Sequence, residues 1–313
     1  MKFNRLTVSV VAAIAVVAIV LSGCKSEQKA MLSFAPKKGK KYEYVMNTVQ
    51  DVEMEQMGQK INSKTNIGFT YLMAVGEKDK DNNTTVVTTF KRIAFTSESP
   101  MGNMAYDSDN IDTNNNPMMG IMAKAFGSLV NKSITLMVND KGEVVALSGM
   151  EAIFADMIKS MGLDSLPEAD KILAQLKPQF SDDQFKKTFD EMLRILPGKS
   201  INIGESWDIE TEKNMMNMGI KTKSTYTLKE MNGKNAVVTL SSAFDVVKSG
   251  AELQGGEMKM NGTQTGTITV DTETGFPLQS NITQDINTTT NAMGMEIPMK
   301  MKGLITITSK EIK

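Results

Sequence analysis

Apolar and polar residues alternate with a period of two over much of the chain, which predicts β-sheet with one wet face. Tyr42, Tyr44 and Met46 fall on one face of such a strand, while Glu43 and Asn47 fall on the other. Short polar turns follow the alternating segments, as in sheets whose neighbouring strands run in opposite directions. We therefore predict a fold of the α+β class that is mainly antiparallel β-sheet.

A helical period marks the residues in the middle of the chain, 149–198. The apolar stripe of the first predicted helix consists of Met150, Ile153, Phe154, Met157, Ile158 and Met161. A capping box at Ser181–Gln184 begins a later helix, Pro167 opens one between them, and a further helix starts at Pro117. Apolar stripes must be buried, and the sheets are the only large partner, so we expect the helices to cover or plug a sheet.

Four features recur in the same order in two parts of the chain. In residues 39–148 the features are a start at Gly39, a strand at Thr70–Leu72, a Val-Val strand at Thr85–Thr88 and a turn with Gly142. In residues 199–313 the corresponding features are a start at Gly204, a strand at Thr225–Leu228, a Val-Val strand at Ala236–Thr239 and a turn with Gly275. Four matches in one order argue for internal duplication. We predict two duplicated β modules, half-barrel or sandwich-like, on either side of the helical insertion, which form two similar antiparallel sheets or one long curved one.

The amino-terminal residues have the pattern of a bacterial lipoprotein export signal. Two basic residues precede an apolar run of about 14 residues, Val8–Leu21, which ends in Leu-Ser-Gly-Cys at Cys24. The run is shorter than the roughly 20 residues of a membrane-spanning helix. We predict a signal peptide at 1–23, acyl chains such as palmitate on Cys24, and a polar tether at 24–38.

The residue after the predicted lipid site bears on the location of the protein. An aspartate there would favour retention in the inner membrane in many Gram-negative bacteria, and this chain has Lys25. We therefore predict a lipid anchor in the outer membrane of the cell envelope. Both the periplasmic face and the outer face remain open.

Charge and arginine content exclude nucleic acid as an expected partner. Removal of the signal peptide leaves 33 of the 35 basic residues against all 36 acidic ones, because only Lys2 and Arg5 are lost. A mildly acidic protein has no general attraction for nucleic acid. Only Arg92 and Arg194 remain for bidentate recognition of phosphate.

The absence of histidine excludes several kinds of catalysis. Without it there is no Ser-His-Asp triad, histidine metal site or imidazole acid–base step. Lipidation would remove Cys24, the only cysteine, as a nucleophile. No pair of carboxylates and no phosphate-binding loop stands out. We predict no enzymatic activity and no cofactor.

One acidic loop offers oxygen ligands at alternate positions. Asp107, Asp109 and Asp112 could bind Ca²⁺, which takes six to eight oxygen ligands. The loop lacks the glycine and the final glutamate of an EF-hand. A solvated loop with Asx turns is the alternative.

The chain has 26 methionines, and many lie at the tips of predicted hairpins. The tip methionines are Met54, Met57, Met101, Met104, Met215, Met216, Met218, Met293, Met295, Met299 and Met301. Methionine is flexible and polarisable, so such a surface suits varied apolar ligands, lipid or peptide. The alternatives are irregular core packing, a docking surface on a structural or assembly subunit of an envelope complex, and Cu(I) or Ag(I) binding by thioethers.

The sequence also resembles a known family over most of residues 36–313. The Gly-x-x-Tyr/Trp starts at Gly39 and Gly204 and the Val-Asp-x-x-x-Gly turn at Gly275 are similar to those of uncharacterised lipoproteins from Bacteroidota. That family implies no activity. In outline the chain is similar to periplasmic lipoprotein carriers, whose half-barrel is closed by helices over an apolar cavity. Our leading hypothesis is an apolar ligand in or near a Met-lined β cavity.

Overall fold

A computed structural model of the chain describes residues 29–56, 58–100, 102–111, 117–165, 173–174, 177–215, 218–249, 258–292 and 295–313. The predicted signal peptide and Cys24 lie outside these ranges, as does most of the helix predicted from Pro167. The strands are β1 Lys29–Leu32, β2 Lys41–Gln56, β3 Gln59–Lys78, β4 Thr84–Ser99, β5 Gly102–Asp107, β6 Ser133–Val138, β7 Val144–Ser148, β8 Lys199–Asn202, β9 Ser206–Met215, β10 Met218–Asn232, β11 Asn235–Ser249, β12 Met258–Asp271, β13 Pro277–Ala292 and β14 Met295–Ile312. The α-helices are α2 Pro117–Gly127, α3 Met150–Met161 and α5 Asp182–Leu193. The predicted class, mainly antiparallel β with helices, is confirmed.

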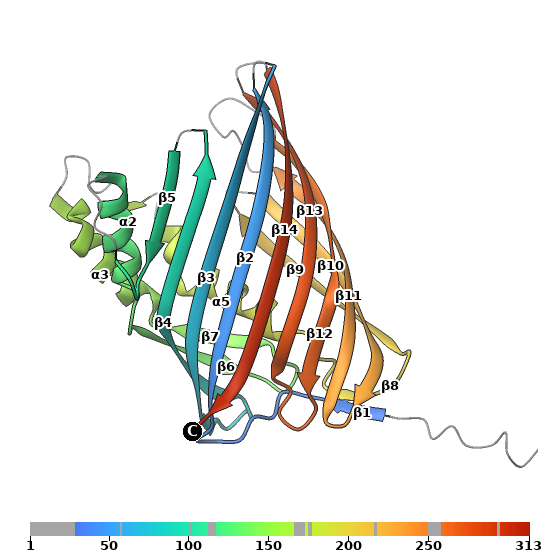
Figure 1. Cartoon of the computed structure of the whole chain (residues 1–313). Coiled ribbons are helices and arrows are strands. Elements are labelled where there is room, and N and C mark those ends of the chain that lie inside the picture. The colour runs from blue at the N-terminus through green and yellow to red at the C-terminus, as the bar shows by residue number, and fades with distance from the viewer. Residues whose placement is uncertain are drawn as a thin grey trace, which may run out of the picture.

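One large curved sheet contains both predicted modules (Figure 1). Its strand order is β7-β6-β4-β3-β2-β14-β13-β12-β11-β10-β9, with β5 beside β4, while β1 and β8 form a separate ribbon. Strand β14 pairs with β2 from Met299 opposite Met54 to Ile312 opposite Lys41. This pairing joins two meanders of antiparallel strands edge to edge. The first runs from β2 to β7 and the second from β9 to β14, and together they form one open sheet instead of two packed layers.

The two meanders begin in the same register. The N–H of Gly39 donates to the carbonyl oxygen of Val75 at 2.8 Å, and the N–H of Gly204 donates to that of Leu228 at 2.7 Å. Both glycines have a positive φ, 81° and 88°. The spacing that suggested duplication in the sequence therefore corresponds to the same turn-and-strand geometry in both halves.

The turns at Gly142 and Gly275 hold other segments of the chain in place. A Cβ at Gly142 would lie 2.2 Å from the carbonyl oxygen of Leu193, and one at Gly275 would lie 2.2 Å from that of Ser33. Both glycines also have φ above +70°, which a side chain disfavours. Each turn thus packs directly on the backbone of a segment outside its own hairpin.

We expect the Gly275→Ala variant to lose about 2–4 kcal/mol of unfolding free energy, because backbone strain and overpacking add. The measurement is urea unfolding followed by circular dichroism. Gly204→Ala is the control: it has a similar φ but nothing within 4 Å of the added Cβ. It should lose only about 1–2 kcal/mol. Equal losses in the two variants would show that contact with Ser33 is unimportant.

The hydrophobic core fills one end of the curved sheet, called the base here. Along β2, Tyr42 and Tyr44 are buried, whereas every inward residue from Met46 to Met54 is only half-buried. Strand β3 shows the same gradient, from buried Tyr71 to half-buried Ile61. Along these two strands the interior is therefore packed at the base and less filled toward the other end, while Ile220, Phe244 and Ile286 form a smaller buried cluster toward that end on the other half of the sheet.

The segment predicted as a tether at 24–38 contributes to this core from Lys29 onward. Ala30, Leu32 and Phe34 are 3%, 0% and 2% exposed. Strand β1 pairs with β8, with Ala30 opposite Ile201. The period-two alternation of Ala30, Leu32 and Phe34 is short and lies among polar residues, so the sequence pattern did not indicate a strand.

Five pairs of consecutive strands have their adjoining ends opposite the base, at the end called the rim here. The described strand ends at the rim are Gln56, Gln59, Ser99, Gly102, Met215, Met218, Ser249, Met258, Ala292 and Met295. The turns between β3 and β4, β6 and β7, β10 and β11, and β12 and β13 lie at the base. The described strand ends that flank the predicted methionine-rich tips therefore lie at one end of the molecule.

The helices pack beside and within the curve of the sheet (Figure 1). The predicted stripe of α3 is confirmed, with Met150, Ile153, Phe154, Met157 and Ile158 buried. The predicted cap of α5 is confirmed as well, because Ser181 accepts from the N–H of Gln184. None of the described helices has the length and apolar character needed to cross a membrane.

Helix α5 and the residues after it connect the two edge strands of the sheet. On one side, Asp190 accepts a hydrogen bond at 2.9 Å from the N–H of Val144 at the start of β7. On the other side, the indole Nε1 of Trp207 on β9 donates to the carbonyl oxygen of Ile195 at 3.2 Å. The segment thus plugs the gap between β7 and β9, as the apolar stripe predicted.

Candidate functional site

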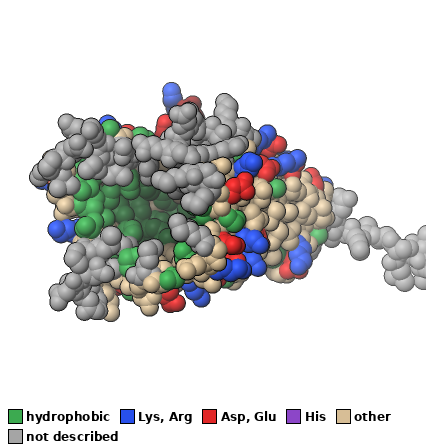
Figure 2. Space-filling view, turned by 90° about the horizontal axis from the view of Figure 1, so that it is seen from above, with side chains coloured by type: hydrophobic (Ala, Val, Ile, Leu, Met, Phe, Trp, Pro, Cys, Tyr) green, Lys and Arg blue, Asp and Glu red, His purple; other side chains and the backbone are tan. Residues whose placement is uncertain are grey.

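A cavity of about 460 Å³ lies between the concave face of the sheet and α5. Seen from the rim, the molecule is hollowed, and hydrophobic side chains line the hollow (Figure 2). Its apolar wall includes Ile209, Ile220, Leu240, Phe244, Ile282 and Ile305, from β9, β10, β11, β13 and β14. The volume falls in the range of small-molecule sites and equals roughly 15 water-sized groups of about 30 Å³ each.

The wall exists because apolar inward positions continue above the packed core. Ile209, Ile282 and Ile305 are only half-buried, although they lie on the concave face of the sheet. In a filled interior such side chains would be packed on all sides. The strands therefore extend beyond the packed core, and the inward side chains on this part of each strand form the cavity wall.

The charged residues of the wall come from α5 and its carboxyl end, and they are paired. Arg194 lies 3.6 Å from Asp190 and 3.9 Å from Glu143, measured from Nη1 to the carboxylate oxygens. Burial raises the pKa of Asp190, while the Val144 N–H and Arg194 oppose the shift. Burial also raises the pKa of Tyr226 to about 12, so its phenol is un-ionised at neutral pH.

The methionines of the wall differ from most of those that the sequence singled out. Of the predicted set, Met301 lines the cavity, together with Met46, Met192 and Met260, which were not predicted as site residues. Met46 could have been found by its alternation with Tyr44 on one strand face. Met192 lies on α5 and Met260 on β12, and their place depends on how those elements pack.

The other predicted methionines that the structure describes lie toward the rim. Met54 and Met299 are half-buried and directly opposite one another on β2 and β14, and Met104 is half-buried on β5. The backbones of Met215, Met218 and Met295 form strand ends at the rim, with Met215 opposite Met218. Met57, Met101, Met216 and Met293 lie outside the described residues. Soft-metal binding by these thioethers stays a prediction.

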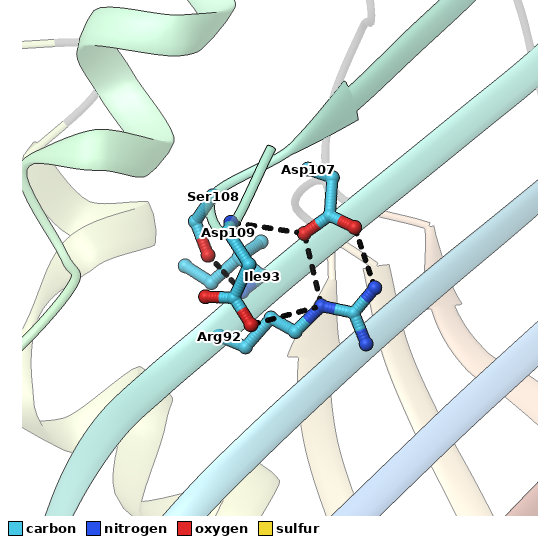
Figure 3. Close-up of polar contacts among 5 residues, drawn as sticks. All are labelled: Arg92, Ile93, Asp107, Ser108 and Asp109. Atoms are coloured by element: carbon cyan, nitrogen blue, oxygen red, sulfur yellow. Dashed lines mark hydrogen bonds and ion pairs between the residues drawn. The ribbon is translucent and has the colours of Figure 1, made fainter. Parts of the chain in front are cut away.

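The predicted calcium ligands Asp107 and Asp109 face an arginine (Figure 3). Arg92 Nε donates to Asp107 Oδ1 at 2.9 Å and lies 3.6 Å from Asp109 Oδ2. Hydrogen bonding to Arg92 lowers the pKa of Asp107, and its carboxylate accepts from the Asp109 N–H in an Asx turn. Asp112 lies outside the described residues, and within them no group of three or more acidic, histidine or cysteine residues is placed to bind a metal.

Sequence comparison finds a family without an assigned activity. The sequence pattern described as "Family of unknown function (DUF6263)" matches residues 81–277, more than half of the 313 residues. No curated protein matches the chain.

Several solved structures share weak similarity with the chain. "Lipid-protein interactions in lipovitellin" matches at 5% identity with a TM-score of 0.46, over 88% of this chain and 25% of that one, so this chain spans about a quarter of its length. The COG4313 outer membrane channel from Pseudomonas putida F1 matches at 10% identity with a TM-score of 0.24, over 92% and 99% of the two chains. OccK7 (OpdD) from Pseudomonas aeruginosa matches at 7% identity with a TM-score of 0.25, over 88% and 100%.

Proposed function

We propose that this chain, which belongs to the DUF6263 family of unknown function, is a non-enzymatic protein that binds an apolar ligand, lipid or peptide. The observation that carries the proposal is the cavity of about 460 Å³ between the concave sheet and α5. Half-buried isoleucines and methionines face it, and each Å² of apolar surface that a ligand covers contributes about 25 cal/mol. A ligand would thus replace the missing core above the base.

In this proposal the protein is a lipoprotein held at the outer membrane by acyl chains on Cys24. The apolar run Val8–Leu21 and the Leu-Ser-Gly-Cys sequence support the anchor. Lys25 supports the outer membrane as its destination. The bound ligand and the anchor are separate apolar groups on one protein.

The full-length protein, extracted from membranes with mild detergent, tests the proposal by native mass spectrometry. We expect a non-covalent adduct of a small apolar molecule in addition to the mass of the lipidated chain. Organic extraction should release the adduct and leave the covalent lipid in place. Consistent absence of an adduct, together with no uptake of added lipid or apolar peptide, would contradict the proposal.

A bulky side chain inside the cavity should weaken the binding of an apolar ligand. Thr48 lines the cavity and is half-buried, so a Thr48→Trp side chain would occupy the space that a ligand needs. We expect at least about a tenfold loss of affinity for an apolar fluorescent probe, because a tenfold change needs only 1.4 kcal/mol. Thr308→Trp, at an exposed position on the outer face of β14, is the matched control and should bind normally. Equal affinities in the two variants would remove the cavity as the site.

A second candidate function is docking in an envelope complex, and the position of the rim favours it. Hairpin ends that include Met215, Met218 and Met295 gather at one end of the molecule. Crosslinking in intact cells from cysteines introduced there distinguishes the candidates. A docking subunit should give one dominant protein adduct, whereas a ligand carrier should give none that persists after the ligand is removed.

A further inference from the structure

A single row of polar side chains crosses the concave face of the sheet at mid-height. In register, Ser224 on β10 lies opposite Ser242 on β11, and Ser242 lies opposite Gln264 on β12. Gln264 lies opposite Gln284 on β13, and the row continues through Gly303 on β14 to Gln50 on β2. The polar belt, as this row is called here, is Ser224, Ser242, Gln264, Gln284 and Gln50. All five line the cavity.

Apolar rows lie on both sides of the polar belt. The row toward the base contains Tyr226, Leu240, Ile282 and Ile305, and the row toward the rim contains Phe244, Ile286 and Met301. Two residues along a strand span about 6.7 Å, so each apolar row lies about that far from the belt. A ligand lying along the strands would therefore meet apolar, polar and again apolar wall.

The belt retains unused hydrogen-bonding capacity. The hydroxyls of Ser224 and Ser242 are 2.7 Å apart, and Gln264 Nε2 donates to Gln284 Oε1 at 3.2 Å. Each glutamine amide has two N–H donors and an oxygen that accepts twice, so one shared bond leaves most of this capacity open. A Cβ at Gly303 would lie 2.5 Å from Gln284 Cγ and Nε2. The glycine thus makes room for Gln284 to lie flat along the wall.

The one cation among the described wall residues, Arg194, already lies beside two carboxylates. The charged residues of the wall are Asp190, Glu191 and Arg194, all at α5 or its end. Arg194 already lies near Asp190 and Glu143, and Glu191 has an interaction partner as well. A carboxylate or phosphate would lose its water in this cavity without an unpaired cation among the described wall residues.

We infer that the ligand is a neutral lipid of the acylglycerol class, with its ester and hydroxyl groups at the polar belt and its chain on the apolar rows. The inference rests on the proposed binding function and specifies its ligand. Esters and hydroxyls supply the acceptors and donors that glutamine and serine side chains complement. The cavity volume holds one acyl chain, and its opening toward the rim leaves room for the rest.

Titration of the full-length protein with four probes of equal chain length tests this inference. The probes are monododecanoylglycerol, dodecanoic acid, dodecylamine and dodecane. We expect the monoacylglycerol to bind at least about tenfold more tightly than each of the others, a difference that one or two retained hydrogen bonds can supply. The Gln264→Leu/Gln284→Leu double variant should lose the preference for the monoacylglycerol over dodecane and bind the alkane at least as well as before.

Gln279→Leu is the matched control, because Gln279 is an exposed glutamine on the same strand as Gln284 and its side chain faces outward. It should keep the preference for the monoacylglycerol. Equal or tighter binding of the acid, the amine or the alkane by the unaltered protein would overturn the inference and leave the proposed function standing. An undiminished preference for the monoacylglycerol over dodecane in the double variant would also overturn it. Failure of all four probes to bind would overturn the inference, and failure of an added apolar peptide to bind as well would overturn the proposed function itself.

Discussion

The Phe276→Ala variant is expected to lose about 3–5 kcal/mol of unfolding free energy, a large part of the 5–15 kcal/mol that holds a typical domain folded. Phe276 is fully buried at the base. Its ring stacks on Tyr42 with centroids 4.1 Å apart and lies 5.5 Å from Phe34. One side chain thus joins the turn before β13, strand β2 and the segment after β1, and its loss would leave a cavity where three parts of the chain meet.

Chemical denaturation with urea, followed by circular dichroism, measures this loss. Phe95→Ala is the control, because Phe95 is a half-buried phenylalanine whose nearest ring neighbour, Phe126, is 6.3 Å away. It should lose only about 1–2 kcal/mol. A loss at Phe276 no greater than that at Phe95 would show that the base is not the main stabilising region.

The Cys24→Ser variant is expected to lose metabolic labelling with palmitate and to leave the envelope fraction. A hydroxyl cannot take the place of the thiol as the lipid acceptor, and stable anchoring of a soluble body needs two membrane signals. Cell fractionation with immunoblotting and labelling with palmitate give the two readouts. Ser26→Ala, two residues along, should behave as the unaltered protein. Palmitate labelling that persists in Cys24→Ser, or retention of that variant in the envelope, would contradict the predicted anchor.

Local features of this fold were predictable because each depends on a few neighbouring residues. The alternation around Tyr42 marks a strand, the stripe of Met150 and Ile153 marks α3, and Ser181 marks the start of α5. Glycines such as Gly275 mark turns because their φ is positive. The order of these signals also predicted the duplication, and Gly39 and Gly204 have the same hydrogen-bond geometry in the two halves.

The joining of the halves was not predictable, because it depends on pairing between distant residues. Met54 and Met299 face one another across β2 and β14, although more than two hundred residues separate them in the chain. Alternation indicates which residues share a face of a strand, but it does not indicate which strand lies next to it. The sequence therefore left open two similar sheets or one long curved one, and the structure has one sheet.

The same limit applies to the cavity wall. Gln50, Gln264 and Gln284 form one row only because the register of four strands aligns them. Considered singly, each is an ordinary polar residue in a strand. The methionines attracted attention in the sequence because they are numerous, yet Met301 is the member of the predicted set that reaches the wall, and the polar positions of the wall were overlooked.

With the predicted lipid on Cys24, the lengths of the strands would determine how far the cavity mouth lies from the bilayer. Strand β3 has 20 residues, and at about 3.3 Å per residue it measures roughly 65 Å. The five residues from Cys24 to the start of β1 at Lys29 extend at most about 17 Å. A lipid on Cys24 would hold β1 and the packed core close to the headgroups, while the mouth of the cavity projects tens of ångströms into the aqueous space. The ligand would then enter and leave the cavity on the side that faces away from the membrane to which Cys24 is attached.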